Sequence, residues 1–185
     1  RYLEEALAAA TALNEPRELA AASNQLGQLL RVEGDLDRAE ALYHRMLELS
    51  RQLGDRDSTA IGLLNLAMVA ISRGRAEEAR SMLVDVLAII DETGSKPSGQ
   101  SLLEVCAGFA VLRKQWIQAA RFYGAAEAQT AQTGIRRDAG DAAFLEPLIA
   151  AAQQALGSEL FAASEGAGRL LTYDAAVAEA RVWLA

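Results

Sequence analysis

The sequence predicts an all-α fold in which antiparallel helix pairs stack into a superhelix with a repeat of about 40 residues. The same ten-residue pattern begins at Gly34, at Gly74 and again at Lys114. Apolar residues recur at helical spacing on both sides of each of these three turns. Hydrophobic residues make up 51% of the 185-residue chain but only 5% are aromatic, which indicates a large core built mainly of small and aliphatic side chains.

The repeat register assigns each segment in turn. Residues 1–14 align with the second helix of a truncated repeat, because Leu13-Asn14 aligns with Leu53-Gly54. Complete repeats are expected over 17–57, 58–97 and 98–137, each with two amphipathic helices around a short turn. Residues 138–185 are expected to form a degenerate repeat and a C-terminal capping helix, so that the whole chain is one domain.

Proline and hydroxyl residues mark the joints between the repeats. Pro16 and Pro97 occupy nearly equivalent joints, where proline ends the preceding helix at no cost. Helix caps are expected from Asp57-Ser58 or Ser58-Thr59 in the second repeat and from Ser98 in the third.

The C-terminal segment divides at Gly157. A helix is expected over 141–156, bent or restarted at Pro147, and the next helix begins at residue 158. Two glycines are expected to break that second helix, at Gly166 and Gly168.

The last helix is expected over 175–184, with Thr172 as its cap. Its apolar side chains suggest a lid on the exposed end of the stack. These side chains are Val177, Trp183 and Leu184.

Small residues stand where the two helices of each pair would cross. A bulky side chain at such a position would push the helices apart, and larger residues then fill the space against the next repeat. The small residues are Gly27, Ala67 and Ala107 on the first helices and Ala39, Ala79 and Ala119 on the second, and the larger ones are Tyr43, Leu83 and Tyr123.

The first repeat resembles the tetratricopeptide repeat. The stretch Gln25-Leu26-Gly27, then Leu30, Gly34-Asp35-Leu36-Asp37, Ala39 and Tyr43 has the residue types and spacing of that family's signature. The resemblance implies a right-handed α-α superhelix, a tetratricopeptide-like solenoid, whose first helices line a concave surface. The usual repeat has about 34 residues, so a repeat of about 40 implies longer helices here.

Residues 100–185 resemble the terminal repeats of large bacterial ATPase-type regulators, including LuxR-type and antibiotic-regulatory activators. The resemblance is carried by Arg121-Phe122-Tyr123-Gly124-Ala125-Ala126-Glu127-Ala128, Leu145-Glu146-Pro147-Leu148 and Thr172-Tyr173-Asp174. In that family the repeats follow a nucleotide-binding switch domain and serve as a sensing or docking arm. The resemblance therefore implies a bacterial, cytoplasmic signalling protein.

The register places nine residues on the concave surface, which is expected to be polar at one end and apolar in the middle. Such a surface suits an amphipathic helix laid in a groove, with methionine as an adaptable contact. The alternative is that the protein's own chain covers the surface. The nine residues are Asn24, Gln28, Arg31, Leu64, Met68, Ile71, Glu104, Gly108 and Val111.

Catalytic, metal and cofactor sites are not predicted. The sequence has no phosphate-binding glycine loop. The lone His44 is expected in solvent, and Cys106 holds a repeat position that is otherwise leucine. Adjacent acids such as Glu77-Glu78 diverge around a helix. With a net charge of −7 and no apolar run long enough for a membrane span, the chain is expected to contact neither nucleic acid nor membrane.

Three function classes follow. The first is a non-catalytic protein-interaction or regulatory arm of a bacterial transcriptional regulator or signalling ATPase, which binds a protein, a peptide or the parent's own switch domain. The second is a small-molecule sensor that uses the same concave surface, and the third, unsupported by converging titratable groups, is a hydrolase or transferase. A homodimer is also expected, through the truncated first repeat with its Leu3, Leu7 and Leu13.

Overall fold

The computed structural model describes residues 2–13 and 15–185, without the side chains of Tyr2, Ala6 and Leu13. The predicted alignment of Leu13-Asn14 therefore lies outside the described residues. Over the described part the chain forms ten α-helices and no strand, which confirms the all-α class. The helices are α1 (Tyr2–Leu13), α2 (Pro16–Glu33), α3 (Leu36–Gln52), α4 (Arg56–Ser72), α5 (Ala76–Thr93), α6 (Lys96–Leu112), α7 (Trp116–Thr133), α8 (Ala139–Leu156), α9 (Ser158–Arg169) and α10 (Tyr173–Leu184).

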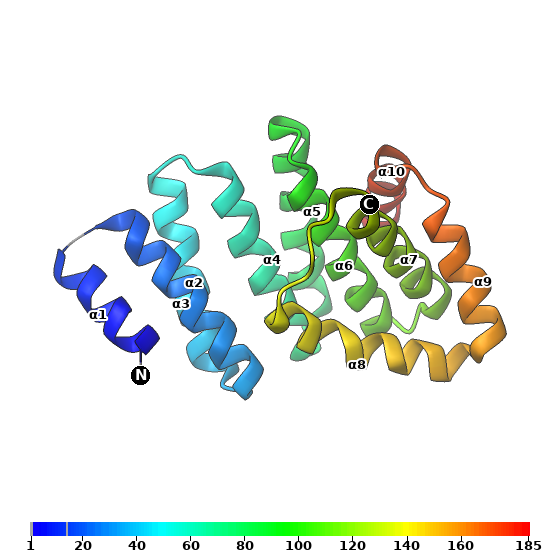
Figure 1. Ribbon diagram of the computed structural model, residues 1–185, viewed down its shortest axis with the longest axis horizontal. Coiled ribbons are helices and arrows are strands. Elements are labelled where there is room, and N and C mark those ends of the chain that lie inside the picture. The colour runs from blue at the N-terminus through cyan, green and yellow to red at the C-terminus, as the bar shows by residue number, and fades with distance from the viewer. Residues whose placement is uncertain (1, 14) are drawn as a thin grey trace.

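Consecutive helices pack side by side into a row of hairpins, which Figure 1 shows from α1 at the left to α7 at the right. The first helices of the three pairs begin at Pro16, Arg56 and Lys96, which are 40 residues apart. This spacing is that of a tetratricopeptide-like solenoid with a long repeat.

The turn within each pair has a left-handed residue at the same place. Gly34 and Gly74 have φ values of 84° and 73°, and Lys114 takes φ 56° in the third pair. Because a Cβ is strained in this region, the third turn keeps the geometry of the others at an energetic cost.

The predicted caps between the pairs are wrong by about one turn. Asp55 caps α4, since its carboxylate accepts a hydrogen bond from the Ser58 amide at 3.0 Å. Ser95, and not Ser98, is the N-cap residue of α6, and Pro97 lies inside the first turn of that helix. A proline near the start is compatible with a helix because the first amides have no intrahelical partner.

Small residues allow the helices of a pair to approach closely, as predicted. Ala39, Ala79 and Ala119 are all completely buried. A Cβ added to Gly27 would lie 2.7 Å from Cε1 of Tyr43, so this aromatic ring occupies the space that glycine leaves. The first hairpin is thus packed by a glycine–tyrosine contact.

The expected break of α9 at Gly166 and Gly168 is wrong, because the helix continues to Arg169. A Cβ on Gly168 would lie 1.9 Å from the carbonyl oxygen of Arg121, and one on Gly124 would lie 2.1 Å from the carbonyl oxygen of Glu165. These glycines permit backbone contact between α7 and α9, so packing and not a turn explains them. The preceding helix α8 also continues, through Pro147.

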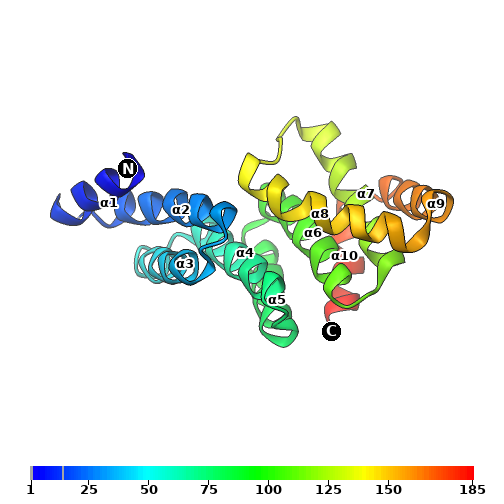
Figure 2. The ribbon, with the colours of Figure 1, turned by 90° about the horizontal axis from the view of Figure 1, so that it is seen from below.

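The last helix has the predicted cap, but it does not cover the end of the stack as predicted. The Thr172 hydroxyl accepts a hydrogen bond from the Ala175 amide and caps α10. It is α9 that packs against α7 at the end of the row, whereas α10 packs across α5, α6 and α7. In Figure 2, α8 lies in front of α6 and α10 lies behind it, so the two helices cover opposite faces. The Trp183 ring meets those of Phe109 and Phe122 edge-on, with centroids 5.4 and 5.0 Å away.

Candidate interaction surface

The first helices α2, α4 and α6 lie next to one another and line the concave groove. Asn24 and Gln28 are partly exposed on its wall. The other predicted residues are buried. Arg31, Leu64, Met68, Ile71, Glu104, Gly108 and Val111 all have less than a tenth of their surface exposed.

The groove is closed by the chain itself, the alternative that the sequence left open. After α7 the chain turns at Gly134 and crosses the groove as residues 135–138, and α8 then packs on α2 and α6. Figure 1 shows this connection running down from the end of α7 to the start of α8. Four of the predicted residues therefore contact this closing segment, namely Gln28, Arg31, Glu104 and Gly108.

Arg31 is the main polar contact between α2 and this closing segment. Its Nη2 atom lies 2.5 Å from a carboxylate oxygen of Asp141, and its Nη1 donates to the Gly140 carbonyl at 3.1 Å. Its Nε donates to the Tyr43 hydroxyl at 3.3 Å. The guanidinium is thus satisfied on both sides of the groove.

Burial disfavours the charged form of both partners, so it acts on their pKa values in opposite directions. Burial alone would lower the pKa of Arg31, but the neighbouring Tyr43 and Asp141 outweigh that effect and raise it, so the guanidinium stays charged. Burial raises the pKa of Asp141 above its ordinary value, although Arg31 opposes the shift. The ionised carboxylate is therefore disfavoured by its surroundings and depends on Arg31.

A second contact lies one turn earlier on the same face of α2. The Gln28 amide donates to the Asp138 carboxylate at 3.0 Å, and the other oxygen of Asp138 caps α8 by accepting from the Asp141 amide at 2.8 Å. Asn24, the next predicted residue, receives a hydrogen bond from Asn65 at 2.8 Å and does not contact α8. At the polar end of the predicted groove, Asn24 therefore contacts α4, whereas Gln28 contacts the start of α8.

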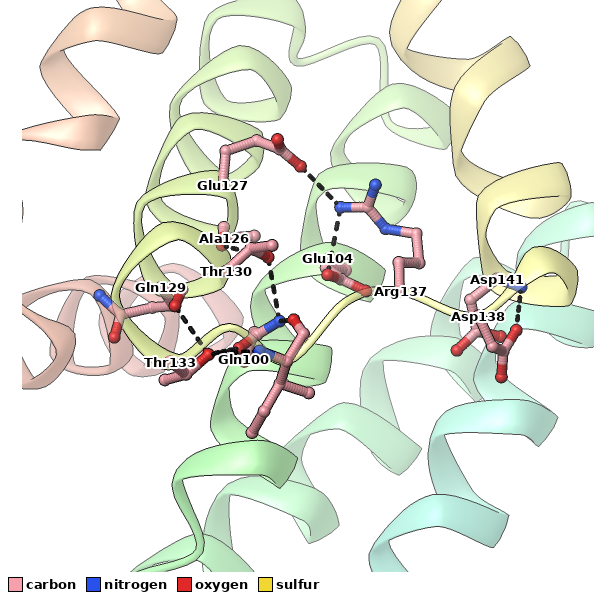
Figure 3. A network of polar contacts seen from close by, with 11 residues as sticks. Gln100, Glu104, Ala126, Glu127, Gln129, Thr130, Thr133, Arg137, Asp138 and Asp141 are labelled. Atoms are coloured by element: carbon pink, nitrogen blue, oxygen red, sulfur yellow. Dashed lines mark hydrogen bonds and ion pairs between the residues drawn. The ribbon is translucent and has the colours of Figure 1, made fainter.

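Arg137 anchors the crossing segment at the other wall of the groove, as Figure 3 shows. Its Nη2 lies 3.1 Å from a carboxylate oxygen of Glu104 on α6 and 2.9 Å from one of Glu127 on α7. Burial raises the pKa of Glu104, and Arg137 opposes the shift. Glu104, predicted as a ligand contact, is therefore engaged within the chain.

The start of the crossing segment is fixed by an amide network around Gln100, also drawn in Figure 3. The Gln100 side chain donates to the Thr130 hydroxyl and to the Ile135 carbonyl, both at 3.0 Å. The Thr133 hydroxyl in turn donates to the Gln100 carbonyl oxygen at 3.2 Å. The direction in which the chain leaves α7 is therefore set by α6.

The apolar part of the surface that contacts α8 is a niche at Gly108. A Cβ on Gly108 would lie 2.8 Å from Cζ of Phe144 and 3.2 Å from Cδ1 of Leu148. Phe144 also lies beneath the Arg31 guanidinium, 5.9 Å from ring centroid to Cζ. One aromatic ring on α8 therefore bridges the polar and the apolar parts of the groove.

A cavity of about 320 Å³ remains beside this ring. It lies between the C-terminal turns of α2 and α4 and the first half of α8. Its lining includes Arg31, Val32, Ile71, Ser72, Phe144 and Leu148.

The residues that occupy the groove are not among the predicted site residues. They are Asp138, the N-cap residue of α8, and Asp141, Phe144 and Leu148 within that helix. The signal that could have identified them is their spacing, which puts two acids, a ring and a leucine on one helix face.

The two residues that could carry chemistry elsewhere in the chain, Cys106 and His44, do not lie in a site. Cys106 is fully buried, which raises the pKa of its thiol, and His44 is exposed. Within the described residues no three His, Cys, Asp or Glu side chains gather as a metal site would require, and no helix has the length and apolar character to cross a bilayer.

The fold and the groove define an α-solenoid of the tetratricopeptide-like class. Residues 18–92, which lie within the helices α2 to α5, match the family model of the tetratricopeptide repeat. This match supports a tetratricopeptide-repeat domain, and such repeats generally mediate protein–protein interaction. No curated protein matches the chain.

Proposed function

We propose that this chain is a non-catalytic protein-interaction arm of a bacterial transcriptional regulator or signalling ATPase, acting in the cytoplasm. The observation that carries the proposal is that the concave groove already accommodates a helix. Residues of α2 and α6 receive α8 through the Arg31–Asp141 ion pair and the Gly108 niche for Phe144. This is the helix-in-groove mode by which many proteins bind an amphipathic partner.

The electrostatics of the groove support a binding role and not an acid–base one. Asp141 and Glu104 have raised pKa values, but each carboxylate is held by an arginine, Arg31 or Arg137. A general acid or base must be free to exchange its proton with a substrate. Paired carboxylates of this kind orient helices.

The regulatory context is supported by the resemblance of residues 100–185 to bacterial ATPase-type regulators. In such proteins a repeat arm reports to a switch domain. The partner proposed here is a helix of another protein or of the parent's own switch domain. A homodimer through α1 is a further arrangement that the partly buried Leu3 and Leu7 allow.

Site-specific photo-cross-linking in the native host tests the proposal. The photoreactive residue p-benzoylphenylalanine replaces Val32, which is 52% exposed at the rim of the cavity, and in a matched control replaces Val84, which is 41% exposed on α5. A cross-linked product of defined mass is expected from position 32 and not from position 84. Mass spectrometry of that product identifies another protein or a second domain of the same chain. Equal labelling at both positions, or none at either, contradicts the proposal.

A second candidate, sensing of a small effector, is favoured by the cavity of about 320 Å³ at Arg31 and Phe144. This volume lies at the lower end of the range of small-molecule sites. Native mass spectrometry of the chain purified from its host should then show an added mass of a few hundred daltons. Replacing Ala143 on the cavity wall with tryptophan should abolish it, and an unaltered chain mass in the wild type would reject the sensor.

A further inference from the structure

The helix that closes the groove is far less buried than its neighbours. Only three of the 18 residues of α8 are buried, Leu145, Ile149 and Ala152, whereas 13 of the 17 residues of α6 are buried. Elements with few buried contacts open at a lower free energy than the core of the same protein. We therefore expect the segment that closes the groove to dissociate from it at a lower free energy than any of the helices that line it.

Both ends of this segment are suited to movement. Gly134 ends α7 with φ 71°, and Pro147 lies inside α8. Because proline has no amide hydrogen, α8 lacks the hydrogen bond that residue 147 would otherwise donate, and the helix is weakest there. We call residues 134–146, between these two points, the strap.

The strap presents a defined pattern to the groove. Asp138 meets Gln28, Asp141 meets Arg31, and Phe144 meets Gly108. These three residues are spaced by three, so they lie along one face of the helix. The acid at Asp141 also lies in the first turn of α8, where the helix dipole favours a negative charge.

The buried Arg31 makes this pattern a requirement for any other occupant. Its side chain is 4% exposed, and Asp141 is its carboxylate partner across the groove. A helix that replaced the strap without supplying an acid would leave a buried guanidinium unpaired, which is strongly unfavourable. A helix with an acid at the same place would restore the pair, so the ion pair selects the occupant more than it stabilises the fold.

We propose that the strap is an exchangeable occupant of the groove, and that the partner of this arm is an amphipathic helix that places a carboxylate on Arg31 and, three residues later, an aromatic ring in the niche at Gly108. This inference rests on the function proposed above and specifies its partner. The strap competes with the partner because it is tethered to the groove and so present at high effective concentration. Release of the strap is therefore the step that admits the partner.

Amide hydrogen exchange on the full chain tests the first half of the proposal. Amides of residues 139–146 are expected to exchange at least tenfold faster than those of residues 102–111 in α6. Asp141→Ala is expected to accelerate exchange in the strap at least a further threefold. If residues 139–146 are as protected as α6, the strap is part of the core and the proposal fails, while the interaction arm itself could still act through another surface.

Competition with a peptide tests the second half. The probe is a fluorescent peptide with the sequence of residues 136–148, measured by anisotropy against the wild-type chain and against Asp141→Ala. Because weakening the tethered strap raises the fraction of open groove, the variant should bind the peptide about tenfold more tightly than the wild type does. The matched control peptide carries alanine in place of both Asp141 and Phe144 and should show no such preference.

Two results would overturn the partner assignment. One is equal binding of the peptide and its control, because the groove would then not recognise the side chains of Asp141 and Phe144. The other is a dimer of Asp141→Ala in sedimentation velocity, because the strap of a second copy would then be the occupant. Failure of the cross-linking experiment at position 32 with success here would instead reject the interaction function and retain the exchangeable strap.

Discussion

The Arg31 guanidinium and the Asp141 carboxylate lie 2.5 Å apart although 110 residues separate them in the chain. The contact joins the first complete helix pair to the segment that follows the third. It therefore holds α8 in the groove that the row of hairpins forms.

This ion pair should behave as a coupled unit. We expect Asp141→Ala to lower the free energy of unfolding by about 2 kcal/mol, somewhat less than the loss of a fully buried partner costs. Arg31→Met should have a similar effect, and the double variant should be little worse than either single variant. Urea denaturation of the four proteins measures the coupling. Additive losses would show that the two side chains stabilise the fold independently.

The left-handed turn residue of the third pair can be improved. Lys114→Gly should raise the free energy of unfolding by about 0.5–1 kcal/mol, because glycine removes the strain of a Cβ at positive φ but adds freedom to the unfolded chain. Lys114→Ala is the matched control and should give no gain, since it keeps the Cβ. Thermal unfolding followed by circular dichroism compares the three proteins. An equal gain in both variants would point to the lost charge as the cause.

The glycines of α9 should differ sharply in their tolerance of a methyl group. Gly168→Ala should cost about 2–3 kcal/mol, because its Cβ would meet the backbone of α7. Gly166→Ala meets no atom within 4 Å and should gain about 0.5–1 kcal/mol from helix propensity. Urea unfolding measures both changes. A tolerated Gly168→Ala would mean that α7 and α9 do not approach as closely as described.

The cap of α4 should show a defined pH dependence. The Ser58 amide and hydroxyl lower the pKa of Asp55 below its ordinary value of 3.8. Its stabilising contribution is therefore present above that value and is lost as the pH falls through the lower, folded-state pKa. At pH 7, Asp55→Ala should cost about 1 kcal/mol, and the difference from wild type should narrow below about pH 3.8.

Asp55→Asn is the control for this cap. Asparagine keeps an acceptor for the Ser58 amide but does not titrate, so its stability relative to Asp55→Ala should not vary with pH. Chemical denaturation at pH 7, 4 and 3 distinguishes the variants. A gap between wild type and Asp55→Ala that widens in acid would contradict the assigned direction of the pKa shift.

The parts of the fold that the sequence predicts correctly depend on local features of the chain. The 40-residue spacing, the crossing alanines and the Thr172 cap depend on residues near in sequence or on a pattern repeated along the chain. The errors have a common cause. Ser58 and Ser98 are good cap residues that lie a turn inside their helices, and Gly168 is a helix breaker retained because another backbone touches it.

The sequence by itself determined that the chain is a stack of helix pairs, because helical periodicity and small crossing residues are local and recur at a fixed interval. Only the tertiary structure decided that α8 fills that groove and that α10 covers the opposite face. Those placements depend on single contacts between distant residues, such as Arg31 with Asp141 and Gly108 with Phe144, for which a repeating pattern carries no signal.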